Sequence, residues 1–127
     1  MNRRRKLPMP FVLSLGVGAS LVAIGLLLLF DPRAGKRAFG KDPGEEDDHT
    51  FHRATGIRQA YIGALIILLA LVRERRALGA LLVTASVVPA ADFLLALKAP
   101  DGGLGKALRH APSVPLVVAL GLPFLRR

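Results

Sequence analysis

The chain alternates between apolar runs and short charged segments. Four runs carry at most one charge each, and they lie at residues 11–30, 59–72, 78–97 and 111–125. About twenty apolar residues are enough for a helix to cross the hydrocarbon layer of a bilayer, and the first and third runs reach that length. The second run reaches it if the helix begins near Ala54 and counts Arg58 as internal.

This pattern predicts an all-α protein, an antiparallel bundle of four transmembrane helices. Only helices and closed barrels satisfy their backbone groups in lipid, and the runs lack the strict alternation of barrel strands. We expect one membrane-embedded domain over residues 1–127, with helices at about residues 9–30, 54–72, 77–98 and 110–125. A signal peptide is the alternative for the first run, but the run is long for one and no small-residue cleavage site follows Phe30.

Small residues at intervals of four indicate where membrane helices approach closely. The spacings are Gly16–Ser20 and Ala19–Ala23 in the first helix and Gly56–Ala60–Ala64 in the second. Arg58 lies nearly opposite the second set at 100° per residue, so it either contacts a further helix or extends to the lipid headgroups.

The net charge of +9 follows from basic residues that flank the apolar runs. They form no stripe interleaved with aromatic residues, so we expect a lipid bilayer rather than nucleic acid as the partner. The two termini and the Arg73–Arg76 turn carry nine Lys and Arg in short segments, and the other two connections carry eight. We therefore expect a multi-pass protein of the cell membrane with both termini in the cytoplasm.

The composition excludes several kinds of chemistry. The chain has no cysteine, so it has no disulfide, thiolate nucleophile or cysteine metal site. Four consecutive carboxylates in Gly44–His49, with His52 nearby, could suggest a divalent metal. Consecutive acids do not converge on one point, however, and the spacing of an EF-hand loop is absent. We expect a solvated acidic loop, no metal and no cofactor.

The ionisable residues within the apolar runs are the candidate site. In an antiparallel bundle the spacing places Asp31, Arg58, Asp92 and His110 at one level, near the outer face. A charge in hydrocarbon is costly, so we hypothesise an Arg58–Asp92 ion pair with His110 adjacent. These three are the candidate catalytic residues. The alternatives are a polar pair that only fixes helix register and a histidine that merely begins a helix at the water boundary.

Other polar residues carry simpler expectations. Thr84 and Ser86 should hydrogen-bond to their own helix backbone. Ser86, His110 and Asp92 include the residue types of a hydrolytic triad, but Ser86 lies over a turn deeper than Asp92 and on another face. Tyr61 is the only tyrosine and is expected near the membrane interface.

Several short motifs occur in a distinctive order. They are Arg37-Ala38-Phe39-Gly40, Thr55-Gly56-Ile57-Arg58-Gln59, Arg76-Ala77-Leu78-Gly79, Val88-Pro89-Ala90-Ala91-Asp92 and His110. Together they resemble the small four-helix membrane proteins known as DUF4267, a domain of unknown function, from about Leu15 to Leu122. The family pattern usually has Gly-x-Arg-Asp at the start of helix two, and Gln59 replaces the acid here. The resemblance implies a membrane bundle and points to Arg58, Asp92 and His110, but it supplies no reaction.

Three functions remain open. The first is a structural or accessory membrane protein whose polar cluster locks the bundle. The second is an intramembrane acid/base enzyme, of isomerase or cyclase type, that uses Asp92 or His110 on a lipophilic small molecule. The third is a transporter subunit that acts as a homo-oligomer, because one such bundle encloses little lumen. An enclosed apolar pocket with Asp92 or His110 on its wall would favour the enzyme, and a packed core with an Arg58–Asp92 bond would favour the first function.

Overall fold

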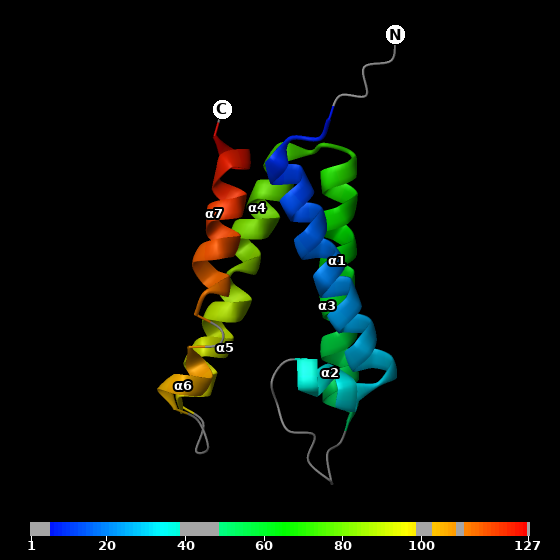
Figure 1. Ribbon diagram of the computed structural model, residues 1–127, viewed down its shortest axis with the longest axis vertical. Coiled ribbons are helices and arrows are strands. Elements are labelled where there is room, and N and C mark those ends of the chain that lie inside the picture. Colours follow the sequence, from blue (N-terminus) through cyan, green and yellow to red (C-terminus); the bar gives the residue numbers. More distant parts are fainter. Residues whose placement is uncertain (1–5, 39–48, 99–102, 109–110, 127) are drawn as a thin grey trace. The chain divides into compact units, whose positions relative to one another are not determined.

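The computed structural model describes residues 6–38, 49–98, 103–108 and 111–126 (Figure 1). The regular elements among these residues are all helices, and they form two compact units, Met1–Val72 and Arg73–Arg127. Three helical stretches are long and apolar enough to cross a membrane: Met9–Phe30, His52–Leu71 and Arg75–Leu95. Only 22% of each of these spans is buried within the protein, so their apolar side chains mostly face outward. These are the features of a multi-pass membrane-embedded protein.

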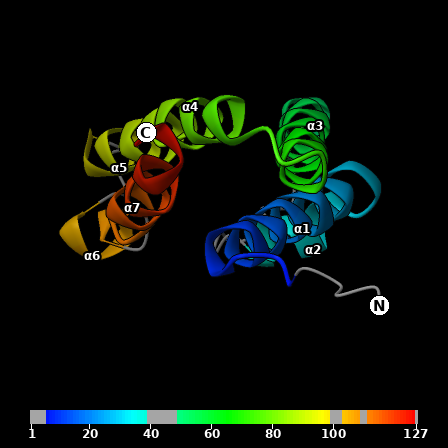
Figure 2. The same cartoon turned by 90° about the horizontal axis from the view of Figure 1, so that it is seen from above.

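The first unit is a pair of long helices, α1 (Met9–Phe30) and α3 (His49–Leu71), with the short α2 (Pro32–Ala38) between them. Figures 1 and 2 show α1 and α3 lying side by side and antiparallel. Asp31 separates α1 from α2. Its carboxylate accepts a hydrogen bond from the N–H of Ala34 at 3.1 Å, and Pro32 begins the helix, where its missing N–H costs nothing.

The buried positions of this pair recur with a period of seven. In α1 they are Phe11, Ser14, Gly18, Gly25 and Leu28. In α3 they are Gly56, Gly63, Ile66 and Ala70. Steps of three, four and seven are typical of left-handed helix pairs, so α1 and α3 pack along their full length with glycine at the closest points.

The second unit contains α4 (Arg75–Ala85), α5 (Val87–Lys98), α6 (Leu104–Ala107) and α7 (Ser113–Leu125). α4 packs against α7, and α6 packs against α5. The guanidinium of Arg75 donates a hydrogen bond to the backbone oxygen of Pro123 at 3.4 Å, which joins the start of α4 to the end of α7. Arg73 precedes α4 with a φ of 59°, the left-handed conformation that often follows the end of a helix.

The third predicted helix is broken at Ser86, between α4 and α5. Pro89 has no N–H to offer the carbonyl of Ala85 and its ring crowds that carbonyl, which is the usual cause of a kink. The N–H of Ser86 turns to the oxygen of Val83 at 3.3 Å, and its hydroxyl donates to the same oxygen at 2.6 Å. The hydroxyl of Thr84 bonds to the oxygen of Ala80 at 2.8 Å. The expectation that both hydroxyls bond to their own helix is confirmed.

α1 has the predicted bounds of the first helix. α3 begins at His49, before the predicted start near residue 54, and the third predicted helix is divided into α4 and α5. Of the four expected spans, three are found among the described residues. The fourth is not confirmed, because α7 has only 13 residues. At 1.5 Å per residue it is roughly 20 Å long, shorter than the ~30 Å hydrocarbon layer. The single-domain organisation stays a prediction, since the two units are compact by themselves.

Candidate functional site

Glycines fix how α1 and α3 are aligned along their length. A Cβ atom added to Gly25 would lie 2.5 Å from the backbone nitrogen of Ala60 and 2.6 Å from the backbone oxygen of Gly56. A Cβ added to Gly63 would lie 2.5 Å from the backbone oxygen of Gly18. Gly25 therefore lies between Gly56 and Ala60 of the facing helix, and Gly63 lies between Gly18 and Val22. The two backbones touch at both points, which only a residue without a side chain permits.

This alignment also fixes the depth of every residue in the unit. Gly18 and Gly25 are seven residues apart on α1, and Gly56 and Gly63 are seven residues apart on α3. Because the helices are antiparallel, each residue toward the C-terminus of α1 corresponds to one residue toward the N-terminus of α3. The centre of Met9–Phe30, at Ala19 and Ser20, is thus level with Tyr61 and Ile62, the centre of His52–Leu71. The two candidate spans share one midplane, as two helices that cross the same bilayer should.

Arg58 lies close to this midplane. It is within one helical turn of the level of Ala23 and three to four residues from the centre of its own span, roughly 5 Å at 1.5 Å per residue. The hydrocarbon boundary is about 15 Å from the centre. The side chain is exposed on the face of α3 opposite the buried glycines. It makes no ion pair with a carboxylate in the described part of its own unit. The two alternatives for Arg58, contact with a further helix and extension to the lipid headgroups, therefore both stay predictions.

Asp31 is far from the level of Arg58, which corrects the expectation that they share one. It follows Ala23 by eight residues, about 12 Å along α1, and lies roughly 17 Å from the midplane. This is the water boundary, where the carboxylate caps α2. Asp31 therefore has a structural role at the surface and is not part of an intramembrane cluster.

Tyr61 is also placed differently from the prediction. It lies at the centre of the span and not near the interface, and its side chain is 67% exposed. Tyr61 is one helical turn from Arg58, so both lie on the outward face of α3. The depth of Tyr61 could have been inferred from the sequence. The seven-residue spacing of Gly18 and Gly25 matches that of Gly56 and Gly63, and this match indicates how α1 and α3 align.

Asp92 lies on α5 in the second unit and is half-buried. It follows Ala85, the centre of Arg75–Leu95, by seven residues, so it is about 10 Å from the midplane of that span. A short turn joins the end of α3 to the start of α4. Because Arg58 and Asp92 belong to different units, their pairing stays a prediction.

Comparison with known proteins gives a family but no function. A family model for a domain of unknown function, DUF4267, matches residues 18–124. The chain belongs to the DUF4267 family. Neither the curated proteins nor the solved structures contained a match to this DUF4267 chain. The resemblance expected from the sequence motifs is thus confirmed, and no role in the cell comes with it.

Two of the sequence predictions for this DUF4267 protein lie outside the described residues. They concern His110, the third candidate residue, and most of the acidic segment Gly44–His49. Among the residues that the structure does describe, no three His, Asp or Glu side chains come together as metal ligands would.

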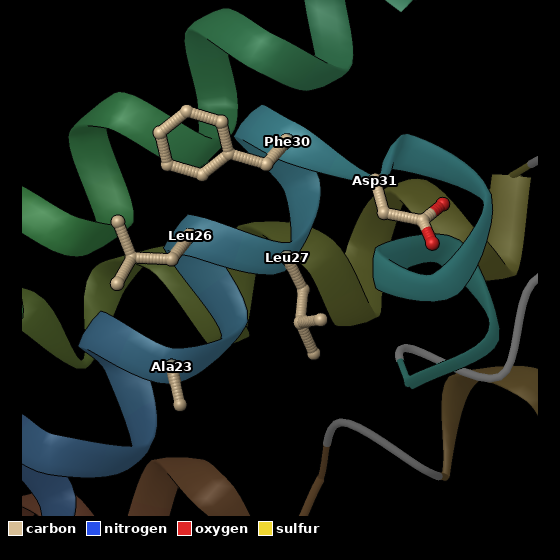
Figure 3. Close-up of a pocket in the computed structure, with 5 residues that line it drawn as sticks. All are labelled: Ala23, Leu26, Leu27, Phe30 and Asp31. Carbon is tan, nitrogen blue, oxygen red and sulfur yellow. The ribbon is translucent and has the colours of Figure 1, made fainter.

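A described hollow lies on α1 of this DUF4267 protein. It is an open groove of about 470 Å³ lined by Ala23, Leu26, Leu27, Phe30 and Asp31. Figure 3 shows that Ala23, Leu26, Leu27 and Phe30 come from the last turns of α1, and that Asp31, the only polar one, follows the end of that helix. Neither Arg58 nor Asp92 lines it, and it is not enclosed. A substrate pocket of the kind used by intramembrane enzymes would be deeper and would include the reactive groups.

Proposed function

We propose that this protein is a structural or accessory membrane protein in which an Arg58–Asp92 ion pair links two glycine-packed helix units. The observation that supports it most directly is the depth of Arg58, a charged and outward-facing side chain roughly 5 Å from the midplane. A charge at such a depth costs about 2.5–3.5 kcal/mol on insertion scales unless a partner offsets it. Among the described acidic residues, Asp92 is the one that lies within a candidate span.

The direction of the side chains favours this pairing. A helical side chain leans toward the N-terminus of its helix. Arg58 therefore extends toward the nearer membrane face, from roughly 5 Å toward the depth of Asp92. Asp92 leans back toward the midplane. Counted along their own spans, the depths of the two residues differ by about 5 Å, which the long arginine side chain can cover.

The described structure gives the other two functions less support. An acid/base enzyme such as an isomerase or cyclase would act on a lipophilic small molecule, which needs an enclosed apolar pocket. The open groove described on α1 is not enclosed and contains neither Arg58 nor Asp92. A transporter subunit needs a polar path, and the described spans carry mainly apolar side chains on their exposed surfaces. Residence in the cell membrane with cytoplasmic termini follows from the basic Arg73–Arg76 turn and stays part of the proposal.

A charge-swap experiment tests the pairing. The single variants Arg58→Asp and Asp92→Arg each place like charges together, and both should reduce the folded fraction in mild detergent. The double variant Arg58→Asp/Asp92→Arg should recover most of it, with a coupling free energy of about 0.5–3 kcal/mol. Folded protein is quantified by size-exclusion chromatography after membrane extraction.

Asp31 supplies the matched control. The double variant Arg58→Asp/Asp31→Arg should show no recovery, because Asp31 is about 12 Å farther along the helix pair than the level of Arg58. The milder variants Arg58→Gln and Asp92→Asn each remove one charge without placing like charges together. They measure the effect of losing the ion pair alone on the folded fraction. Additive effects in the charge swap, or unchanged folding in both milder variants, would remove the basis of the proposal.

A further inference from the structure

Basic side chains lie together at one end of the second unit. α4 and α7 pack antiparallel, so the first residues of α4 lie beside the last residues of α7 (Figure 1). The hydrogen bond from Arg75 to the backbone oxygen of Pro123 and the close approach of Gly79 to Phe124 both bring these two ends together. Arg126 is therefore within about one helical turn of the level of Arg75.

This end of the unit carries a positive charge. Its exposed arginines, here called the arginine cluster, are Arg73, Arg75, Arg76 and Arg126. Glu74 is the only acidic residue in positions 49–91, so four guanidinium groups stand against one carboxylate side chain. The next acidic residue of the unit, Asp92, follows Arg75 by seventeen positions, roughly 25 Å along α4 and α5.

The first unit brings no acidic side chain to this end. All six acidic residues of positions 1–72 lie in sequence between Phe30, the last residue of α1, and His49, the first residue of α3. α1 and α3 are antiparallel, so Phe30 and His49 are at the opposite end of the hairpin from Leu71. Leu71 is the end from which the chain continues directly to Arg73. The charge of the arginine cluster therefore has to be balanced from outside the chain.

The arginine cluster lies at the depth of lipid phosphates. Arg75 begins the candidate span Arg75–Leu95 and precedes its centre, Ala85, by ten residues, roughly 15 Å. The hydrocarbon layer ends about 15 Å from the bilayer centre, and the headgroup region begins there. Leu122 and Leu125 lie just below Arg126 on α7 and are exposed, so apolar surface for acyl chains adjoins the basic groups.

We propose that the arginine cluster binds the phosphate groups of anionic phospholipids. One donor of Arg75 is used on Pro123, which holds the guanidinium where α4 meets α7, and its other N–H groups remain for a headgroup. The neighbouring arginines add the charge that favours a lipid of net negative charge over a zwitterionic one. The proposal goes beyond the ion pair of the proposed function and is independent of it, because it uses neither Arg58 nor Asp92.

Spin-labelled lipids measure this preference. The protein is reconstituted in phosphatidylcholine vesicles that contain a small amount of spin-labelled phosphatidylglycerol or, in parallel, spin-labelled phosphatidylcholine with the same acyl chains. The fraction of label with restricted motion gives the association constant of each lipid with the protein. We expect the parent protein to bind phosphatidylglycerol about fivefold more strongly. The preference should fall near 1 M sodium chloride, where the screening length is about 3 Å.

Two double variants locate the preference on the molecule. Arg76→Gln/Arg126→Gln removes two charges of the arginine cluster but keeps Arg75 and its hydrogen bond to α7. Its preference for phosphatidylglycerol should fall below about half of the parent value. The matched control, Arg33→Gln/Arg53→Gln, removes two exposed arginines near the opposite end of the α1–α3 hairpin. This control should keep the preference of the parent.

Several outcomes would overturn the proposal. An undiminished preference in Arg76→Gln/Arg126→Gln, or an equal loss in both double variants, would show that the arginine cluster is not the site. The salt series uses the parent protein alone, so a preference that is absent or insensitive to salt is decisive even if a variant does not fold. Inorganic phosphate should compete no better than chloride at the same ionic strength. Loss of the preference in millimolar phosphate would assign the arginine cluster to a soluble anion instead.

Discussion

The glycine contacts between α1 and α3 predict opposite effects on the free energy of unfolding for alanine substitutions at two positions of α1, Gly25 and Gly16. A methyl group on Gly25 would lie 2.5 Å from the nitrogen of Ala60 and 2.9 Å from its Cα, whereas ordinary contacts begin near 3.4 Å. These neighbours are backbone atoms, so they cannot rotate away. The helices would have to separate by about 1 Å, and a gap of that size forfeits a quarter to a half of the local dispersion energy.

The expected magnitude follows from two opposing terms. Forcing an extra methyl group into a packed contact costs about 1–3 kcal/mol. Replacing a helical glycine by alanine returns about 0.5–1 kcal/mol through backbone entropy. Gly25→Ala should therefore lower the free energy of unfolding by about 1–2 kcal/mol. Gly16→Ala has no neighbouring atom within 4 Å, so it should raise the free energy of unfolding by about 0.5–1 kcal/mol.

Unfolding in mixed detergent micelles, driven by increasing SDS, provides the measurement. Dyes on cysteines introduced at Val12 and Leu68, which are exposed and nearly level on the two helices, report helix separation by energy transfer. The cysteine-free background keeps the labelling specific. If Gly25→Ala unfolds at the same SDS fraction as the parent, or if Gly16→Ala is the more damaging change, the inferred backbone contact does not exist.

Three further substitutions test other parts of the fold. Gly79→Ala places its Cβ 2.9 Å from that of Phe124 and should destabilise the α4–α7 packing by about 1 kcal/mol. The second unit should then unfold at a lower SDS fraction than in the parent, and an unchanged SDS fraction would contradict the contact. Asp31→Ala removes the cap of α2 and should cost that helix about 1 kcal/mol, seen as faster amide exchange in α2 alone, and exchange that stays slow would show that the cap contributes nothing. Pro89→Ala restores a backbone donor and should merge α4 with α5, seen as slower amide exchange around Ser86; no slowing would assign the break to another cause.

The helices were predictable because their cause is local. An uninterrupted apolar run of sufficient length must become a helix in hydrocarbon, and Met9–Phe30 matches the predicted bounds. The break at Ser86 also has a local cause, Pro89. The sequence prediction counted residues 77–98 as one continuous helix and so did not include this break. The length of α7 depends on its first residue, Ser113. The apolar run from Ala111 to Leu125 does not indicate which residue that is.

The packing and the depths were harder to predict because they depend on pairs of distant residues. Intervals of four suggested Gly16, Ser20, Ala19 and Ala23 as the contact positions of the first helix, and the structure leaves all four exposed. The contacts use Gly18 and Gly25, seven residues apart, and their partners on α3 had to be known before the alignment could be set. The expected small-residue face of the second helix is confirmed at Gly56, which is buried, and not at Ala64, which is exposed.

The self-contained packing of α1 against α3 has a consequence for biosynthesis. A ribosome has completed the first 72 residues before any of α4 exists, and the contacts that hold this hairpin are already all present in them. We expect the nascent hairpin to leave the insertion machinery as a closed pair. The second half of the polypeptide would then enter the membrane after the first pair of helices has already closed.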